Sequence, residues 1–380
     1  MHERLAQTLT ALERRGRRRT LAPIRGIDFS SNDYLGLASS PELRTAVEDA
    51  LRRGLPVGAG ASRLLRGNQE AHVRLEAAAS AFFRAESALF FSSGFLANYA
   101  VFSTLPRRAD LVVYDALIHA SVHDGLRSSH APSVEVPHND ATAFEDAISK
   151  WRAAGGRGVP WIAVETLYSM DGDCAPLAEL TAVARRHDAM LVLDEAHATG
   201  LYGDGGRGLA SDEGLNFEGL AGVISVHTCG KALGVMGGLV LGPRVVSDYL
   251  INRGRPFVYA TAPSPLVSEA VCAALEIVKT QPERRARFHR HVAFAAEALR
   301  AHTDFEPSGS QILPIVLGAD RRATSLAAAL SRRGFDVRAI RPPTVPEGTA
   351  RLRLSITLNV SEAEIDALMA ALAAEYQVLT

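Results

Sequence analysis

Lysine is rare in this chain, so each lysine is informative. Of the 41 lysines and arginines among the 380 residues, only Lys150, Lys231 and Lys279 are lysines. Lys150 ends an amphipathic stretch and Lys279 lies in a polar run, so we expect both to be solvated. Lys231 lies among small and apolar residues in Thr228–Gly234, where poor solvation would lower the pKa of its amine. Such a lysine is a candidate Schiff-base nucleophile, although a lysine at a strand-to-loop corner would look the same.

An acidic residue and a histidine follow another apolar run upstream of Lys231. Asp194 ends the run Met190–Leu193, and His197 lies three residues further on. An acid at the carboxyl end of a buried strand points into the ligand crevice and is costly to bury without a partner. The ring nitrogen of pyridoxal 5′-phosphate (PLP) would be such a partner, because a carboxylate keeps it protonated and the ring able to accept electrons. The alternatives are that Asp194 caps a helix and that His197 is structural. The presence of Lys231 in the same sequence favours the cofactor site over both.

A loop of small residues could hold the phosphate of the same cofactor. The stretch Phe90–Asn98 runs from a strand through Gly94 and Phe95 into a helical pattern. Free backbone N–H groups at a helix N-terminus bind phosphate, although many α/β turns look alike. Thr228 offers a hydroxyl for the same phosphate. His119 follows a strand and could stack on a flat ring, whereas a lone histidine is more often structural.

Short apolar runs alternate with helical stretches and must position these residues. Strands are predicted at 88–91, 111–114, 134–136, 161–165, 190–194, 223–227 and 239–241. Helices are predicted at 70–84, 95–105, 141–153, 176–187, 265–279 and 283–302. Apolar strands separated by helices predict a mostly parallel sheet covered on both faces, with ligands at the carboxyl ends of its strands.

The last part of the chain has a different pattern. Strands are predicted at 312–317, 335–340 and 352–356, with helices at 323–333 and 361–375. This mixture is typical of a small α+β unit with a partly antiparallel sheet. We therefore predict an N-terminal helical, substrate-side segment at 1–40, a large α/β domain at 41–265 and a small domain at 266–380.

Composition excludes several classes of protein. The chain has 41 basic and 42 acidic residues and is 47% hydrophobic, so neither nucleic acid nor an anionic membrane is expected as a partner. No apolar run approaches the roughly 18 residues that a spanning helix needs. The arginines within 14–19 could form a nucleic-acid arm or a transit peptide, but the neutral whole favours a solvated helix end. Three cysteines without metal or disulfide spacing, and no apolar signal segment, predict a cytoplasmic protein without a metal site.

Taken in order, these motifs resemble the fold-type-I PLP-dependent enzymes and, more narrowly, the α-oxoamine synthases. The resemblance begins near Phe29 and continues almost to the C-terminus. It includes Ser30–Leu37, Ser169–Asp173, Asp194–His197 and Thr228–Lys231. It implies an α/β fold of the PLP-dependent transferase type I, with a large, mostly parallel sheet flanked by helices and a smaller α+β domain. It also implies a homodimer whose active sites lie at the subunit interface.

The resemblance implies roles around the cofactor ring. Lys231 would hold PLP as a Schiff base, Asp194 would pair with the ring nitrogen, and His197 would bond the phenolic oxygen. His119 would stack on the ring, and Ser169 would lie close by.

Other matching residues would bind the phosphate or the substrates. Gly94, Phe95 and Thr228 would contact the cofactor, while Thr261 would reach the phosphate of the neighbouring subunit. Arg341 would bind the amino-acid carboxylate, because a guanidinium donates two parallel hydrogen bonds to it. The substrate motif near the N-terminus contains Asn32, and the resemblance aligns Arg17 with a residue that meets the acyl substrate.

The stretches Ala339–Pro346 and Gly348–Arg353 resemble the biotin-pathway branch of the family. The implied reaction condenses L-alanine with a pimeloyl thioester, carried by CoA or a carrier protein, to 8-amino-7-oxononanoate, CO₂ and the free thiol. The alternatives are a sibling synthase using glycine, such as a glycine C-acetyltransferase, an aminotransferase, or a PLP-binding regulator. The segment Ser169–Asp173 favours a synthase over an aminotransferase. A regulator would need an additional DNA-binding domain, whereas the resemblance to the catalytic scaffold covers the residues of this chain.

Overall fold

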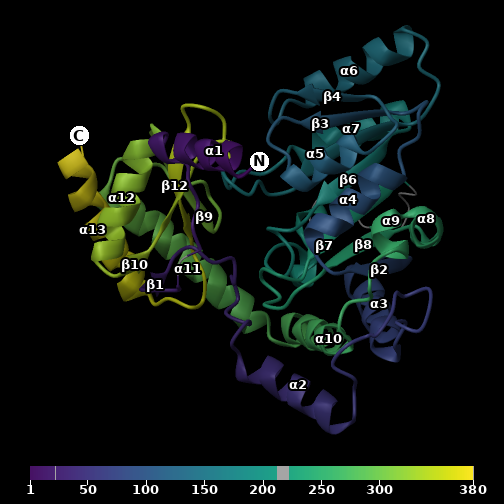
Figure 1. Cartoon of the computed structure of the whole chain (residues 1–380), viewed down its shortest axis with the longest axis horizontal. Helices are drawn as coiled ribbons and strands as arrows, with labels where there is room; N and C mark the ends of the chain where they lie inside the picture. Colours follow the sequence, from purple (N-terminus) through teal and green to yellow (C-terminus); the bar gives the residue numbers. More distant parts are fainter. Residues whose placement is uncertain (22, 212–221, 380) are drawn as a thin grey trace. The chain divides into compact units, whose positions relative to one another are not determined.

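The chain folds into two compact units (Figure 1). A computed structural model describes residues 1–21, 23–211 and 222–379. The small unit consists of Met1–Tyr34, Met170–Asp173 and Ala286–Thr380, and the large unit consists of Leu35–Ser169 and Cys174–Arg285. Most of the predicted site residues lie in the large unit, and Arg17, Asn32 and Arg341 lie in the small one.

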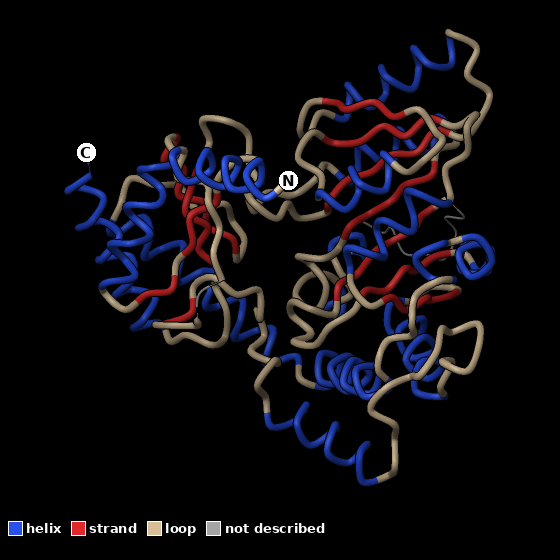
Figure 2. Tube along the Cα trace, in the orientation of Figure 1, coloured by secondary structure: helices blue, strands red, loops and turns tan. Residues whose placement is uncertain are grey.

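A seven-stranded sheet forms the centre of the large unit, and its strands are the red segments of that unit in Figure 2. The strands lie in the order β2-β8-β7-β6-β5-β3-β4; all neighbours are parallel except that β8 runs antiparallel to β2 and β7. Their bounds are β2 Ser87–Phe91, β3 Leu111–Asp115, β4 Ser133–Val136, β5 Pro160–Glu165, β6 Met190–Asp194, β7 Val223–Thr228 and β8 Gly238–Gly242. Each predicted strand of this sheet is confirmed to within one residue, and so is the mostly parallel α/β fold.

Helices cover both faces of this sheet because its strands are apolar on both sides. Val112, Ala163 and Val192 pack with helix α4 in one core, while the alternating Val113 and Ile162 pack in a second core with α6 and α7. The helices are α2 Pro41–Arg52, α3 Glu70–Phe83, α4 Gly94–Thr104, α5 Ala120–Arg127, α6 Ala141–Ala153, α7 Leu177–His187, α8 Arg244–Arg253, α9 Arg255–Val258 and α10 Pro265–Thr280. Two short 3₁₀ turns, η1 Asp204–Gly206 and η2 Leu209–Ser211, follow β6.

The small unit is an α+β structure. Its sheet has the antiparallel order β11-β12-β9, and a separate two-stranded parallel pair joins β1 to β10. The elements are α1 His2–Arg14, β1 Ile27–Asp28, α11 Pro282–His302, β9 Ile312–Gly318, α12 Asp320–Arg332, β10 Phe335–Asp336, β11 Arg338–Ile340, β12 Ala350–Ser355 and α13 Glu362–Leu379. The single strand predicted at 335–340 is therefore wrong. It is two strands, because its first half pairs with β1 and its second half with β12.

The boundary between the units differs from the one predicted at residue 265. Helix α10 packs on α2 and α3 and so belongs to the large unit, which extends to Arg285. The turn Met170–Asp173 belongs to the small unit instead, where Arg351 donates a hydrogen bond to the Asp171 carboxylate. Gly172 has a φ of +75°, and a Cβ there would lie 2.5 Å from the carbonyl oxygen of Ile312. Only glycine fits this position.

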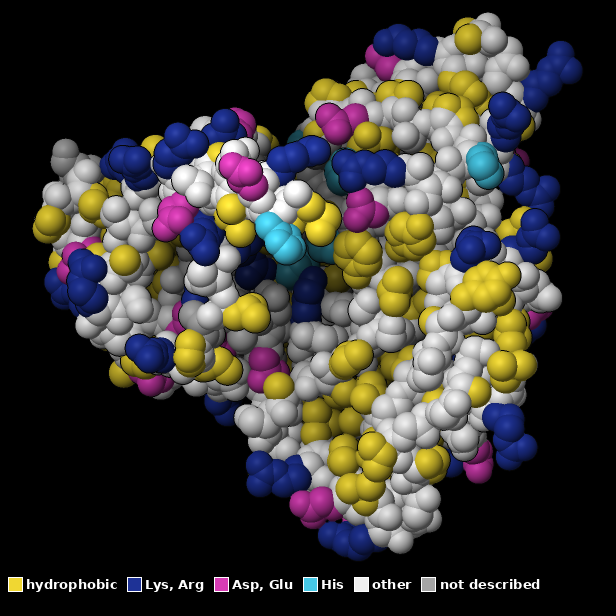
Figure 3. Space-filling model, viewed as in Figure 1, with side chains coloured by type: hydrophobic (Ala, Val, Ile, Leu, Met, Phe, Trp, Pro, Cys, Tyr) yellow, Lys and Arg dark blue, Asp and Glu magenta, His cyan; other side chains and the backbone are white. Residues whose placement is uncertain are grey.

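The surface carries mixed charge. Basic and acidic side chains are interspersed over the face shown in Figure 3, in keeping with the near-neutral total. Across the residues that the structure describes, every helix is too short or too polar to cross a membrane.

A neutral histidine is buried against the sheet of the large unit. His227 on β7 is 1% exposed, and its ring lies 4.0 Å from that of Phe83. The Thr199 hydroxyl donates to the Glu195 carbonyl oxygen, so its oxygen accepts from His227 Nδ1 at 2.8 Å, and the Ser225 hydroxyl donates to Nε2 at 2.8 Å. Burial lowers the pKa of His227 to about 3.

This histidine should make the fold acid-sensitive. The unfolded chain takes up a proton near the ordinary histidine pKa of about 6.5, but the folded chain does so only near 3, so the free energy of unfolding falls as the pH drops between these values. The slope from this group is about 1.4 kcal/mol per pH unit. Urea unfolding at pH 7 and pH 5 should show a smaller loss for His227→Gln, which keeps a donor and an acceptor but does not titrate. Equal losses in both proteins would contradict the assignment.

Candidate active site

The lysine singled out by the sequence contacts the predicted histidine. Lys231 Nζ lies 2.6 Å from His197 Nε2. The two residues come from the loops that follow β7 and β6, which are neighbours in the sheet, so their carboxyl ends meet at one edge. His197 is buried, with 4% of its surface exposed. A hydrogen bond between these two nitrogens requires one of them to donate a hydrogen and the other to accept it with a lone pair. The amine and the imidazole therefore cannot both act as donors in this contact.

Asp194 lies at the end of β6 and is held as a hydrogen-bond acceptor. Its Oδ2 accepts from the side-chain amide of Asn98 at 2.6 Å, and its Oδ1 accepts from the backbone N–H of Ala196 at 2.9 Å. The side chain is 6% exposed. A carboxylate is the species that accepts at both oxygens, so the geometry presents a fixed negative charge for a cationic partner.

Asn98 links this carboxylate to the predicted ring-stacking histidine. Its amide nitrogen donates both to Asp194 and to the hydroxyl of Ser121, at 3.1 Å. Ser121 Oγ lies 2.7 Å from His119 Nδ1, which also accepts from the Ser121 backbone N–H at 3.2 Å. The hydroxyl hydrogen therefore goes to Nδ1, and the hydrogen of the neutral ring is on Nε2.

His119 has the properties of a stacking ring. The residue is exposed, while desolvation lowers its pKa despite the opposing charge of Asp194. Phe95 meets it edge to face at 6.3 Å between ring centroids. The stacking of this ring on the cofactor stays a prediction.

The start of helix α4 forms a cradle beside Thr228. Ser93 caps the helix by accepting from the Leu96 N–H at 3.1 Å, which leaves the first backbone N–H groups of the helix directed outward. A Cβ on Gly94 would lie 3.2 Å from both Cβ and Oγ1 of Thr228. Gly94 and Thr228, which the sequence assigns to the same phosphate, therefore lie side by side, and the phosphate contact itself stays a prediction.

Thr261 lies close to the same cradle. It lines a small cavity of about 20 Å³ together with Ser92, Leu96 and Phe257. The structure thus brings Thr261 near the phosphate loop of its own chain. That it serves a neighbouring subunit stays a prediction.

A second carboxyl group lies beside Asp194. Glu165 ends β5, is 2% exposed and pairs in register with Asp194 across the sheet. Its Oε2 accepts from the backbone N–H of Ser169 at 3.0 Å, so it fixes another predicted cofactor contact. Burial, and then the charge of Asp194, raise the pKa of Glu165 to about 8 against the opposing effect of Lys231.

Three residues of this site were missed from the sequence: Asn98, Ser121 and Glu165. Glu165 carries the signal used for Asp194, an acid at the end of a buried strand, and could have been found by it. Asn98 lies on α4 and Ser121 on α5, and neither carries a local signal of its own. Asn98 bonds Asp194, 96 positions away, and Ser121, 23 positions away, and no local pattern indicates such partners.

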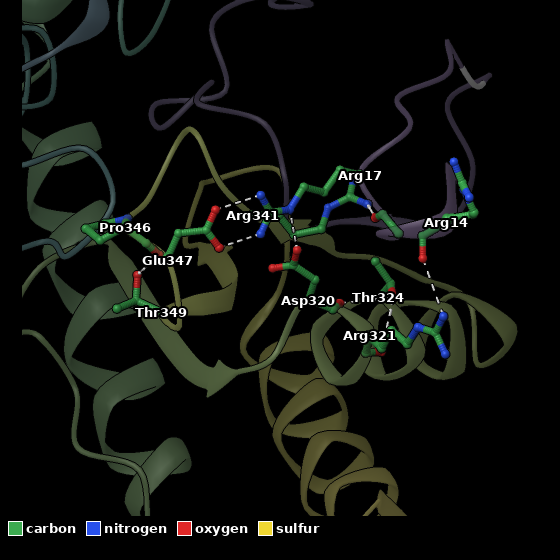
Figure 4. A network of polar contacts seen from close by, with 10 residues as sticks. Arg14, Arg17, Asp320, Arg321, Thr324, Arg341, Pro346, Glu347 and Thr349 are labelled. Atoms are coloured by element: carbon green, nitrogen blue, oxygen red, sulfur yellow. Dashed lines mark hydrogen bonds and ion pairs between the residues drawn. The ribbon is translucent and has the colours of Figure 1, made fainter. Parts of the chain in front are cut away.

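The small unit holds the predicted substrate arginines, which Figure 4 shows in one network. Arg341 donates to the backbone carbonyl of Gly16, and burial lowers its pKa, helped by the charge of Arg19. Arg17 is bound by two carboxylates, Asp320 at 2.5 Å and Glu347 at 2.5 Å. The segment that follows α1 is therefore tied to the loop that carries Arg341.

Asn32 lies in a separate network of the small unit. Its Oδ1 accepts from the Tyr34 hydroxyl at 3.0 Å, and that hydroxyl accepts from Arg353 at 3.2 Å. Its predicted role in substrate binding is not tested by these contacts.

Comparison with known proteins identifies the class of fold and site described above. Residues 24–372 match the family Aminotransferase class I and II. The chain therefore belongs to the aminotransferase class I and II family. A serine palmitoyltransferase from S. paucimobilis, solved with a bound PLP–myriocin aldimine, superposes with a TM-score of 0.89 at 27% identity, covering 99% of this chain and 97% of that one.

The similarity is higher to one particular group of that family. An 8-amino-7-oxononanoate synthase from Anaeromyxobacter dehalogenans is 42% identical over 382 residues, covering 96% of this chain and 94% of the relative. The structure of an 8-amino-7-oxononanoate synthase from Francisella tularensis superposes with a TM-score of 0.78 at 28% identity, covering 93% of this chain and 98% of that one. Within the family, the chain groups with the 8-amino-7-oxononanoate synthases.

The residues of the large unit fit PLP. Lys231 provides an amine for its aldehyde and Asp194 a fixed carboxylate for its ring nitrogen. The helix start at Gly94, packed on Thr228, provides N–H and hydroxyl donors for its phosphate.

The Asn98 hydrogen bond to Asp194 should stabilise the fold even without a cofactor. Hydrogen bonds to a charged group contribute about 2 kcal/mol, and breaking this one leaves a buried carboxylate with one donor fewer. We expect Asn98→Ala to lower the free energy of unfolding by about that amount in urea titrations. The control is Tyr99→Phe on the same helix, which loses only an exposed hydrogen bond to Ser128 and should cost less than about 0.5 kcal/mol. Equal losses would show that Asn98 does not support Asp194.

Proposed function

We propose that this enzyme condenses L-alanine with a pimeloyl thioester, using PLP, and releases 8-amino-7-oxononanoate, CO₂ and the free thiol. The reaction is a step of biotin biosynthesis. The observation that carries the proposal is the contact of Lys231 with His197 beside a fixed Asp194 carboxylate, in a chain 42% identical to an 8-amino-7-oxononanoate synthase over nearly its whole length.

Each residue around the cofactor has one task. When bound, PLP supplies an electron-accepting ring that stabilises negative charge at the Cα of the amino acid. Asp194 holds the ring nitrogen in its protonated form, and the Asn98 and Ala196 donors keep that carboxylate in place. His119 covers one face of the ring with its neutral imidazole.

Lys231 moves the proton. Its Nζ would hold the cofactor through the aldehyde and, as a free amine, would take the Cα proton of the amino acid. An arginine could not do this, since its guanidinium stays protonated. His197, 2.6 Å away, shares protons with this amine and offers a hydrogen bond to the phenolic oxygen of the ring.

The substrates are held from the small unit. We assign binding of the alanine carboxylate to Arg341, because a guanidinium can donate two parallel hydrogen bonds to a carboxylate. Asn32 and Arg17 belong to the substrate side. Arg17 is already paired with Asp320 and Glu347. We therefore expect Arg17 to contact the acyl substrate while it stays in this ion-pair network.

The enzyme works as a homodimer in the cytoplasm. Large apolar side chains are exposed beside the cofactor cradle, namely Phe95 at 41%, Met236 at 55% and Tyr259 at 74%, and a second copy would cover them. All three cysteines are free thiols, and Cys174 is exposed, which suits a reducing compartment.

Replacement of Lys231 and of Lys279 should have different effects. Lys231→Ala should abolish turnover while the fold survives, because no other amine lies in the cofactor site. Lys279→Ala is the matched control, since its ammonium is exposed and only 3.6 Å from Glu276, and it should keep full activity. Borohydride reduction of the PLP-loaded protein, followed by peptide mapping, should label residue 231. Label at 150 or 279, or turnover by Lys231→Ala, would refute the assignment.

The choice of substrates can be tested by thiol release. Alanine with pimeloyl-CoA should release CoA, whereas glycine with acetyl-CoA, the pair used by a sibling synthase, should release little. The assay pairs alanine, glycine and serine with thioesters of several chain lengths. Release with glycine and acetyl-CoA but not with alanine and pimeloyl-CoA would leave the family intact and overturn the reaction.

A further inference from the structure

Two buried acids end neighbouring strands on the same face of the large sheet. Glu165 and Asp194 are register partners on parallel strands, so their side chains point to the same side. That side is the α4 face, because Asp194 bonds Asn98 on α4 and the residues two positions earlier, Ala163 and Val192, pack in the same core. Both acids are therefore at the carboxyl edge where Lys231 emerges.

The two carboxyl groups have different partners. Both oxygens of Asp194 accept hydrogen bonds. Glu165 accepts at Oε2 from the backbone N–H of Ser169, whose hydroxyl also interacts with this carboxyl group, while its Oε1 is fully buried and has no hydrogen-bond partner. Glu195, another buried acid nearby, differs again: Thr166, Leu209 and Ala210 all donate to it. Among these three acids, only Glu165 has a carboxyl oxygen without any hydrogen-bond partner.

The charges around Glu165 determine whether its unpartnered oxygen is protonated. The charged groups that act on Glu165 are Asp194 from β6 and Lys231 from the loop after β7. Two carboxylates side by side in a buried site repel each other, so one of them keeps a proton. Burial, and then the charge of Asp194, raise the pKa of Glu165 to about 8. Glu165 is then a neutral acid with one O–H.

We propose that Glu165 is a further cofactor-side residue: its Oε2 holds Ser169 in place, and its second oxygen donates a hydrogen bond to the group bound beside Asp194. The acceptor is an oxygen of the cofactor, because the ring nitrogen beside Asp194 is protonated and has no lone pair. A neutral donor at this point holds the cofactor without adding a second negative charge next to Asp194. The inference rests on the proposed function only in requiring PLP in this site.

Two substitutions at position 165 test this role through cofactor affinity. Glu165→Gln keeps an acceptor for Ser169 and a neutral donor, so the apoprotein should bind PLP within about threefold of the wild-type affinity. Glu165→Leu has neither and should bind about tenfold more weakly. Binding is followed by the absorption of the PLP adduct, with no substrate present. Glu195→Gln is the matched control, because it changes an acid outside the cofactor contacts and should leave PLP affinity unchanged.

The outcomes separate this inference from the proposed function. Wild-type affinity in Glu165→Leu, or equal weakening in Glu165→Gln and Glu165→Leu, would overturn the role of Glu165 alone. A wild-type protein that takes up no PLP would overturn the proposed function.

Should Glu165→Leu fail to fold, the pH dependence of unfolding decides. The unfolded chain loses the Glu165 proton near pH 4.5 and the folded chain near 8, so wild-type stability falls as the pH rises between them. Glu165→Gln should fall less over that range, and an identical fall would overturn the inference.

Discussion

A buried negative charge at the end of β6 is the constraint around which the site is built. The carboxylate of Asp194 is 6% exposed and would be costly there without donors. The fold supplies them from two directions: the chain immediately after the strand, through Ala196, and helix α4, through Asn98. Satisfying this one charge therefore fixes α4 against the carboxyl edge of the sheet.

That fixation has consequences on both sides of Asp194. The helix that provides Asn98 begins at Gly94, so the same rigid element places the phosphate cradle and the support of the ring-nitrogen partner. The second hydrogen of Asn98 goes to Ser121, which sets the tautomer of His119. In the proposed site, the residues assigned to the phosphate, the ring nitrogen and the ring face of the cofactor are linked through helix α4 and the hydrogen bonds of Asn98. Because its surroundings are already arranged, little ordering remains to be done when the cofactor binds.

Sequence patterns predicted the strands of this sheet well because apolar runs bounded by helices leave few alternatives. They also predicted which strand ends carry chemistry, as at Asp194 and Lys231. They failed where the outcome depends on partners distant in sequence. The run 335–340 reads as one strand, but its halves pair with different strands. Likewise, the apolar face of α10 predicts that this helix packs against other elements. It does not predict that these elements are α2 and α3 rather than the small unit.

Charge state is the sharpest example of this limit. Glu165 and Asp194 have the same sequence signature, an acid that closes a buried strand, and adjacent strands bring them together. They nevertheless differ in function because Asn98 donates to one and not to the other. Burial, and then the charge on Asp194, disfavour ionisation of Glu165. A site that must hold one negative charge opposite a cationic ring nitrogen can thus contain two acids without becoming doubly charged.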